Sequence, residues 1–160
     1  MTALLLGKKP ARPGAVSFKF SDFADISQLA APPPRFGHDN MLNRVPWGML
    51  ANDQVGDCYV AGAMHESMLW NAEAGKAVRF SDDDAIKNYS RITGYDPSDP
   101  STDQGTDVAS ALDDRRKHGI IDSNGTAHKI GAYVALEPGN WEQLRYAAYY
   151  FDGVGIGVNF

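Results

Sequence analysis

Three consecutive segments in the middle of the chain carry the start and stop signals of short helices, and they restrict the fold more than any other feature. Residues 57–74 repeat apolar side chains at helical spacing and are followed by a glycine. Ser81 provides an N-cap for a second segment that ends near Gly94. Asp107 provides one for a third segment, which has cations in its last turn and ends at Gly119. The middle of the chain is therefore predicted to be helical.

The last third of the chain changes its periodicity. Residues 129–136 alternate apolar side chains with others, which predicts a strand. Asn140 and Gln143 predict the start of a short helix that closes near Gly153. Residues 154–160 alternate again, with glycines on the second face, which is typical of a strand approached closely by another backbone. Helices followed by strand, helix and strand predict an α+β fold.

The first part of the chain has little periodicity and contains the block Pro32-Pro33-Pro34. Residues 1–45 are therefore predicted to form an extended, basic, proline-rich N-terminal arm. A chain of 160 residues and 17.4 kDa suits one compact domain. We expect that domain over residues 46–160, with a helical subdomain over residues 46–125 and a partial β subdomain over residues 126–160.

The net charge of −5 conceals an uneven distribution. Residues 1–20 carry four cations and no acid, whereas residues 81–114 contain nine aspartates with only Lys87 and Arg91 to balance them. Four cations are too few for tight nucleic-acid binding at physiological salt, so we expect a flexible or docked arm and no nucleic-acid partner. The acidic stretch lacks the Asp-x-Asp-x-Asp-Gly spacing with a closing Glu, which favours solvated helix starts over a metal site.

Cys58 is the only cysteine, which excludes an intrachain disulfide and an all-cysteine zinc site. The early apolar run, residues 3–6, is too short for a signal peptide and has its lysines on the wrong side. No stretch approaches the roughly 20 apolar residues that span a bilayer. We therefore expect a cytoplasmic or virion-associated protein without a visible secretion signal and without a membrane partner.

Cys58 lies in the first turn of the first predicted helix, behind a polar loop that contains a glycine. Unpaired N–H groups at a helix N-terminus stabilise a thiolate. With a side-chain amide from the loop, they can also receive the negative charge of a tetrahedral intermediate. Two interpretations follow from these residues: Cys58 is a nucleophile, or it is a small buried side chain that packs the start of the helix.

Residues 52–63, Asn-Asp-Gln-Val-Gly-Asp-Cys-Tyr-Val-Ala-Gly-Ala, resemble the cysteine helix of papain-like cysteine peptidases. The Gly-Asp-Cys form is similar to calpain-type and phage-encoded members. The order and spacing of the family's later elements hold over residues 47–160, and residues 89–95 look most like variants of tailed bacteriophages. The resemblance implies a papain-like fold, hydrolysis of peptide or amide bonds, a peptide or protein substrate, and no cofactor or metal.

The resemblance also implies roles for particular residues. Cys58 matches the nucleophile of this thiol protease family. The family's oxyanion glutamine lies six residues before the cysteine, where this chain has Asn52, while Gln54 lies four residues before it; either amide is a candidate. The residues expected to line the substrate cleft are Gly56, Asp57, Gln104 and Gly105.

A cysteine nucleophile of this type needs an imidazole within hydrogen-bond reach. In the family this histidine, and the asparagine that orients it, follow the strand matched by residues 154–158. The histidines present are expected to be surface, capping or arm residues: His38, His65, His118 and His128.

Three explanations for the unassigned base remain open. The natural chain is longer, a partner chain completes the sheet, or the protein is a non-catalytic bacteriophage virion or assembly protein on a papain-like scaffold. In the last case its partners would be other virion subunits, bound through the N-terminal arm and the edge of the terminal strand.

Overall fold

The computed structural model describes residues 12–151 and 153–158, which fall into two compact units. The first unit consists of residues 40–131, and the second combines residues 12–39 with the described residues from 132 onward. The sequence suggested a separate arm up to residue 45. In the structure residues 40–45 belong to the first unit, and residues 12–39 are grouped with the C-terminal part, where Phe20 N–H donates to Ala135 O at 2.8 Å and Ala135 N–H donates to Phe18 O at 2.9 Å.

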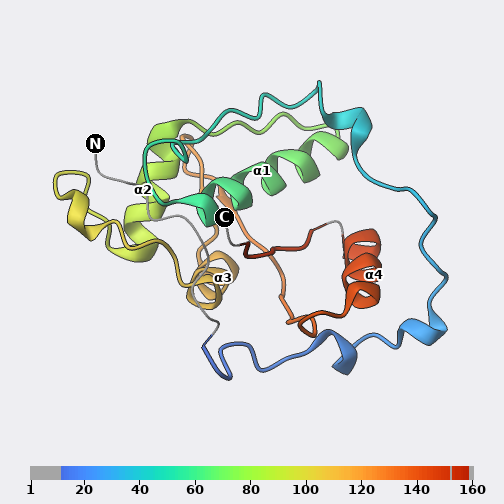
Figure 1. Ribbon diagram of the computed structural model, residues 1–160. Helices are drawn as coiled ribbons and strands as arrows, with labels where there is room; N and C mark the ends of the chain where they lie inside the picture. Colours follow the sequence, from blue (N-terminus) through green and yellow to red (C-terminus); the bar gives the residue numbers. More distant parts are fainter. Residues whose placement is uncertain (1–11, 152, 159–160) are drawn as a thin grey trace. The chain divides into compact units, whose positions relative to one another are not determined.

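Three helices of the first unit lie where their sequence signals predicted them (Figure 1): α1 (Cys58–Glu73), α2 (Asp82–Thr93) and α3 (Val108–Lys117). Ser81 forms a capping box with Asp84 at the start of α2, and the Asp107 side chain accepts a hydrogen bond from Ser110 N–H at the start of α3. Gly94 ends α2 in the left-handed conformation, with φ of 79°. The prediction of these helices is confirmed, and the caps of α2 and α3 are local interactions that the sequence itself displays.

The core of the first unit forms between α1, α2 and the loop that precedes α1. Helix α1 contributes five of its thirteen buried members, among them Ala61, Met64 and Met68, whose helical spacing predicted a buried face. The complete cluster is Val45, Leu50, Ala51, Val55, Val60, Ala61, Ala63, Met64, Met68, Ala85, Tyr89, Tyr95 and Ile120. The loop and the helix that surround Cys58 therefore rest on the same core.

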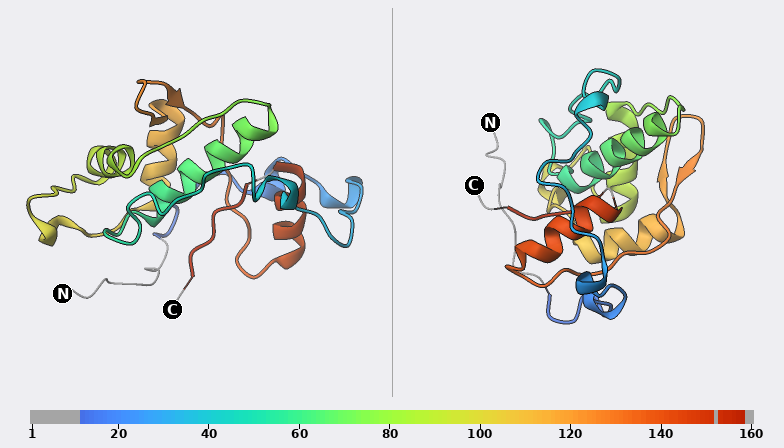
Figure 2. Two further views of the ribbon diagram at one scale, coloured as in Figure 1. Left: turned by 90° about the horizontal axis from the view of Figure 1, so that it is seen from above. Right: turned by 90° about the vertical axis from the view of Figure 1, so that its right-hand side faces the viewer.

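A short hairpin closes the first unit. The strands β1 (Ile120–Ile121) and β2 (Ala127–His128) pair antiparallel and follow directly on α3 (Figure 2), and β1 contacts both α1 and α2. Gly119 precedes β1 with φ of 82°, and a Cβ at this position would lie 3.0 Å from His128 N. The glycine that the sequence placed after α3 thus allows the hairpin to approach the helix end.

The second unit contains α4 (Trp141–Phe151), which begins where predicted, with Asn140 Oδ1 accepting from Gln143 N–H at 3.0 Å. The two predicted strands are wrong. Residues 129–136 contribute only a one-residue parallel bridge between Lys19 and Ala135, and residues 153–158 form no strand within the described chain. Alternation makes a strand only where a neighbouring backbone pairs with it, and no described segment pairs with residues 153–158. The end of that predicted strand, residues 159–160, lies outside the described residues.

The described chain thus has four α-helices and one two-stranded antiparallel sheet, a mixed α+β composition. Residues 12–39 run mostly without regular structure, interrupted by short 3-10 turns at Phe20–Asp22 and Ile26–Gln28. Within the described ranges, no helix combines the length and apolar character needed to cross a membrane.

Candidate active site

Cys58 is the first residue of α1, and its side chain is exposed. The alternative of a small buried side chain packing the helix start is therefore wrong. The helix behind the thiol is 16 residues long and packed against the core of the first unit, so the position of the thiol is supported by a rigid element. A thiol at this place is available to an incoming electrophile.

The residue before the thiol, Asp57, is the N-cap of α1 but does not act as one. Its φ of −95° and ψ of 19° depart from the extended conformation of a usual N-cap, and its carboxylate accepts no hydrogen bond from the first turn. The backbone N–H groups of Cys58 and Tyr59 consequently have no acceptor in the described part of the chain. These two amides, beside the exposed thiol, are available to an oxygen carrying negative charge.

The Asp57 side chain turns into the protein instead. The residue is fully buried, and neither carboxylate oxygen has a hydrogen-bond partner among the described residues. Burial, together with the nearby charges of Asp103, Asp82 and Asp53, raises the pKa of Asp57 to about 7. The sequence assigned Asp57 to the substrate cleft, but its buried carboxyl group does not face solvent.

The loop before α1 carries both candidate amides. Turns hold this loop, with Gln54 N–H and Val55 N–H both donating to Ala51 O, at 2.8 and 3.0 Å. Leu50 and Ala51 have positive φ angles of 54° and 65°. Ala51 N–H donates to Asp82 Oδ1 at 3.1 Å, which ties the strained turn to the start of α2.

The side chains of Asn52 and Gln54 make no hydrogen bond to any described residue, and Gln54 is exposed. Both amides are therefore free to donate to a ligand.

Two loops far apart in sequence meet beside Cys58. The Asp103 carboxylate accepts from Gly56 N–H at 2.9 Å with one oxygen and from Tyr89 Oη–H at 2.6 Å with the other. Tyr89 Oη in turn accepts from Gly105 N–H at 3.0 Å. A buried tyrosine thus joins the loop before the thiol to the glycine that the sequence assigned to the cleft wall. Burial and the bond to Asp103 raise the pKa of Tyr89, which keeps its hydroxyl group a neutral donor.

Glycine is needed at position 56 for this arrangement. A Cβ at Gly56 would lie 2.7 Å from Asp103 Oδ1. The predicted role of Gly56 in binding substrate is therefore accompanied by a structural one that the sequence did not reveal. Asp103 and Tyr89 were also missed as parts of the site, because no local pattern marks a contact 47 residues apart.

The other two predicted cleft residues lie on the 103–107 loop. Gln104 is exposed, and its side-chain amide donates to Ser101 O at 2.8 Å. Gly105 has φ of 71°, faces open space, and lines a pocket of about 260 Å³. The other residues lining this pocket are Ile92, Thr93, Thr106, Asp107 and Ser110, and Cys58 is not among them.

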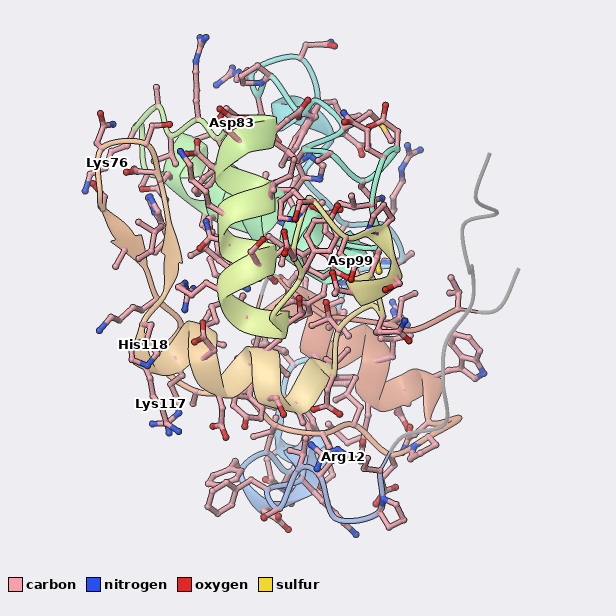
Figure 3. All side chains as sticks on the ribbon, turned by 90° about the vertical axis from the view of Figure 1, so that its left-hand side faces the viewer. Arg12, Lys76, Asp83, Asp99, Lys117 and His118 are labelled. Carbon is pink, nitrogen blue, oxygen red and sulfur yellow. The ribbon has the colours of Figure 1, made fainter. Side chains whose placement is uncertain are left out.

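Two histidines of the first unit have their rings engaged by other groups. His65 Nε2 lies 2.9 Å from Trp47 O, and its ring packs edge-on against the Trp47 ring. His128 Nε2 lies 3.0 Å from Asp122 Oδ2. His118 is the C-cap of α3, at the end marked by Lys117 (Figure 3). His38 belongs to the second unit, where it lines a largely apolar pocket.

No three histidine, cysteine, aspartate or glutamate side chains within the described residues are placed to hold a metal ion. The chain matches no protein-family model, no curated protein and no solved structure. The arrangement around Cys58 is therefore interpreted from its own geometry: an exposed thiol, two free amides, two free side-chain amides and a glycine-containing loop tied to the thiol loop.

Proposed function

We propose that the protein is a papain-like cysteine peptidase, or its N-terminal portion, in which Cys58 attacks the peptide bond. The observation that carries this proposal is the exposed thiol in the first turn of α1, where the N-cap side chain leaves the amides of Cys58 and Tyr59 unoccupied. A nucleophile and donors for a developing oxyanion are thus held on one helix start.

The proposed reaction follows from these groups. The Cys58 thiolate forms a bond to the carbonyl carbon of the substrate, and the carbonyl oxygen becomes an oxyanion. The amides of the first turn and the side chain of Asn52 or Gln54 stabilise that charge. The C–N bond then breaks as an imidazolium gives its proton to the leaving amine, and water hydrolyses the resulting thioester to release the acid and regenerate the thiol.

Gly105 supports the substrate side of the proposal. It has no side chain and faces open space on a loop fixed by Tyr89, so an extended peptide backbone can approach it closely. Gln104 beside it offers an exposed side chain to a substrate. Gly56 N–H donates to Asp103, and Gly105 N–H donates to Tyr89. These hydrogen bonds fix the loop that carries Gly105 relative to the loop before Cys58.

The proposed reaction also needs an imidazole base near Cys58. The proposal does not assign this role to His65, His118 or His128. The family resemblance places the catalytic histidine after residues 154–158, which match a strand of the family but form none in the described chain. We expect the intact mass of the protein from its natural source to exceed 17.4 kDa, because the proposal requires a further segment carrying that histidine. A natural mass equal to that of the 160-residue chain would remove this source of the base.

The direct test compares two electrophiles on Cys58. The full chain is treated with a peptidyl vinyl sulfone and with the same electrophile lacking the peptide, and adducts are followed by intact-mass spectrometry. A peptide-binding site predicts faster labelling by the peptidyl reagent, by at least about tenfold. Replacing Gly105 with Asn, which tolerates the φ of 71° at this position, should reduce the peptidyl rate and leave the small-reagent rate unchanged. Equal rates for both reagents in the unaltered chain would overturn the proposal.

One observation favours a second candidate, a non-catalytic bacteriophage virion or assembly protein on the same scaffold. The rings of His65 and His128 are already engaged, with Trp47 O and Asp122 Oδ2 respectively. This candidate predicts that Cys58→Ala leaves particle assembly unchanged, whereas removal of residues 1–45 disrupts it. Normal assembly by the truncated chain would count against it.

A further inference from the structure

We propose that the protonation state of Asp57 controls the reactivity of Cys58, with the neutral carboxyl group permitting the thiolate and the ionised carboxylate suppressing it. The inference concerns the nucleophile of the proposed function and names Asp57 as a positioning residue for it. It rests on Cys58 being the reacting group, but its test needs neither a bound peptide nor an imidazole.

The first step is the environment of the carboxyl group. Asp57 is fully buried, and both its oxygens lack a hydrogen-bond partner among the described residues. A charged carboxylate in such a place loses its hydration without compensation, so the neutral form is favoured. The same side chain at an ordinary N-cap would be exposed, hydrogen-bonded to the first turn and ionised.

The second step is the set of groups around it. Asp103, Asp82 and Asp53 face Asp57 from the three neighbouring segments, and Tyr89 from α2 is near enough for its own ionisation to be opposed by the Asp57 charge. Asp103 and Asp82 hold the loop through Gly56 N–H and Ala51 N–H. Like charges reinforce the effect of burial, which is consistent with a pKa near 7 for Asp57.

The third step connects Asp57 to the thiol. The two residues are adjacent, with Cα atoms about 3.8 Å apart, so the carboxyl group and the sulfur are at most about 9 Å apart. A negative charge at that distance in partly buried surroundings opposes a second one.

Asp57 acts through Cys58 and does not touch the substrate, because both its oxygens are buried. Its role is therefore distinct from that of Asn52 or Gln54, whose side chains are free to donate. It also differs from a purely structural role, since a structural aspartate would not alter the pH profile of thiol alkylation.

The test measures the rate of Cys58 alkylation by iodoacetamide from pH 5 to 9 in the full chain, which has no other cysteine. In Asp57→Asn the rate should rise with pH as a single titration. In the unaltered chain the rise should be retarded above about pH 7, leaving the rate about threefold to tenfold lower at pH 8. Asp83→Asn is the matched control, because Asp83 is an exposed first-turn residue of α2 (Figure 3), and its profile should equal that of the unaltered chain.

A second measurement keeps the inference testable if Asp57→Asn folds poorly. The infrared band of a protonated carboxyl group should persist to about pH 7 in the unaltered chain, and the alkylation profile should change over the same pH range. Superimposable alkylation profiles for the unaltered chain and Asp57→Asn would overturn the inference, as would the absence of a protonated carboxyl group at pH 6. Failure of peptidyl labelling with the profile difference intact would overturn the peptidase proposal alone.

Discussion

A carboxyl group buried without a hydrogen-bond donor makes folding depend on pH. The pKa of Asp57 is raised to about 7 in the folded protein by burial, against 3.8 for the exposed group. Between these values the folded state holds a proton that the unfolded state has lost, so the free energy of unfolding falls as pH rises. Below about pH 4 Asp57 is protonated in both states. Above about pH 7 it is ionised in both states, so the free energy of unfolding falls no further.

Asp57→Asn should therefore leave the free energy of unfolding unchanged near pH 4 and raise it by about 1–3 kcal/mol at pH 8. The expected gain is below the roughly 4 kcal/mol of the whole pKa shift, because relaxation and water penetration in part offset the cost of the buried charge. Urea denaturation at both pH values measures it, with Asp83→Asn as a control that should change neither. Equal destabilisation by Asp57→Asn at both pH values would contradict the expected linkage.

Two glycines close together in the chain should respond oppositely to the same substitution. Gly56→Ala places a Cβ 2.7 Å from Asp103 Oδ1 and should break the bond between Asp103 and Gly56 N–H, lowering stability by about 1–3 kcal/mol. Gly62→Ala meets nothing within 4 Å on the exposed side of α1 and should raise stability by about 0.5–1 kcal/mol. Thermal unfolding of the two variants checks both signs.

At the scale of elements, α1 and α3 are joined by a buried arginine. Arg115 forms an ion pair with Glu66 and also donates to Ser67 Oγ at 3.2 Å, and its guanidinium lies 5.4 Å from the centre of the Trp70 ring. The sequence has three consecutive cations in the last turn of α3 and predicts the same role for all of them, which is to stabilise the negative end of the helix dipole. Only Arg115 of the three is buried. Which cation turns inward depends on the position of α1.

Arg115→Ala should lower the free energy of unfolding by about 3–5 kcal/mol, because it leaves the largely covered Glu66 carboxylate without its partner. Arg116→Ala is the control: its ion pair with Asp113 is exposed, and its loss should change stability by less than about 0.5 kcal/mol. Chemical denaturation of both variants separates the two cases. Similar small effects would indicate that Arg115 is solvated.

The elements that sequence reasoning located share one property. Helices α2, α3 and α4 begin through contacts between residues three apart, such as Ser81 with Asp84, so their signals are visible locally. The predicted strands failed because a strand needs a partner elsewhere in the chain. The same reason explains why the position of Cys58 on its helix was predictable and the contact from Asp103 to Gly56 was not.

At the scale of the whole molecule, the two units differ in how they bury apolar side chains. Every member of the main core cluster lies between Val45 and Ile120, within the first unit. In the second unit, Phe20, Pro32 and Ala147 are the buried apolar side chains among the described residues. The large exposed ones include Phe18, Phe23, Trp141, Phe151 and Ile156. The first unit therefore has its own source of stability.

A fragment of residues 40–131 should consequently fold alone, with helical circular dichroism and a cooperative thermal transition. A fragment of residues 132–158 should not, because Arg145 and Tyr150 of α4 depend on the carbonyl groups of Pro32, Pro33 and Ala30. Circular dichroism of both fragments provides the measurement. A non-cooperative transition in the longer fragment would show that the core of the first unit is insufficient.

The close approach of Asp103 to Gly56 also has a consequence for divergence. Because the carboxylate occupies the space of a missing Cβ, the two positions cannot vary independently, although 47 residues separate them. A lineage that acquires a side chain at position 56 must also shorten or displace the one at position 103, and Tyr89 then loses the acceptor for its hydroxyl group. Positions 56, 89 and 103 should therefore change together in related sequences, as a single inherited unit.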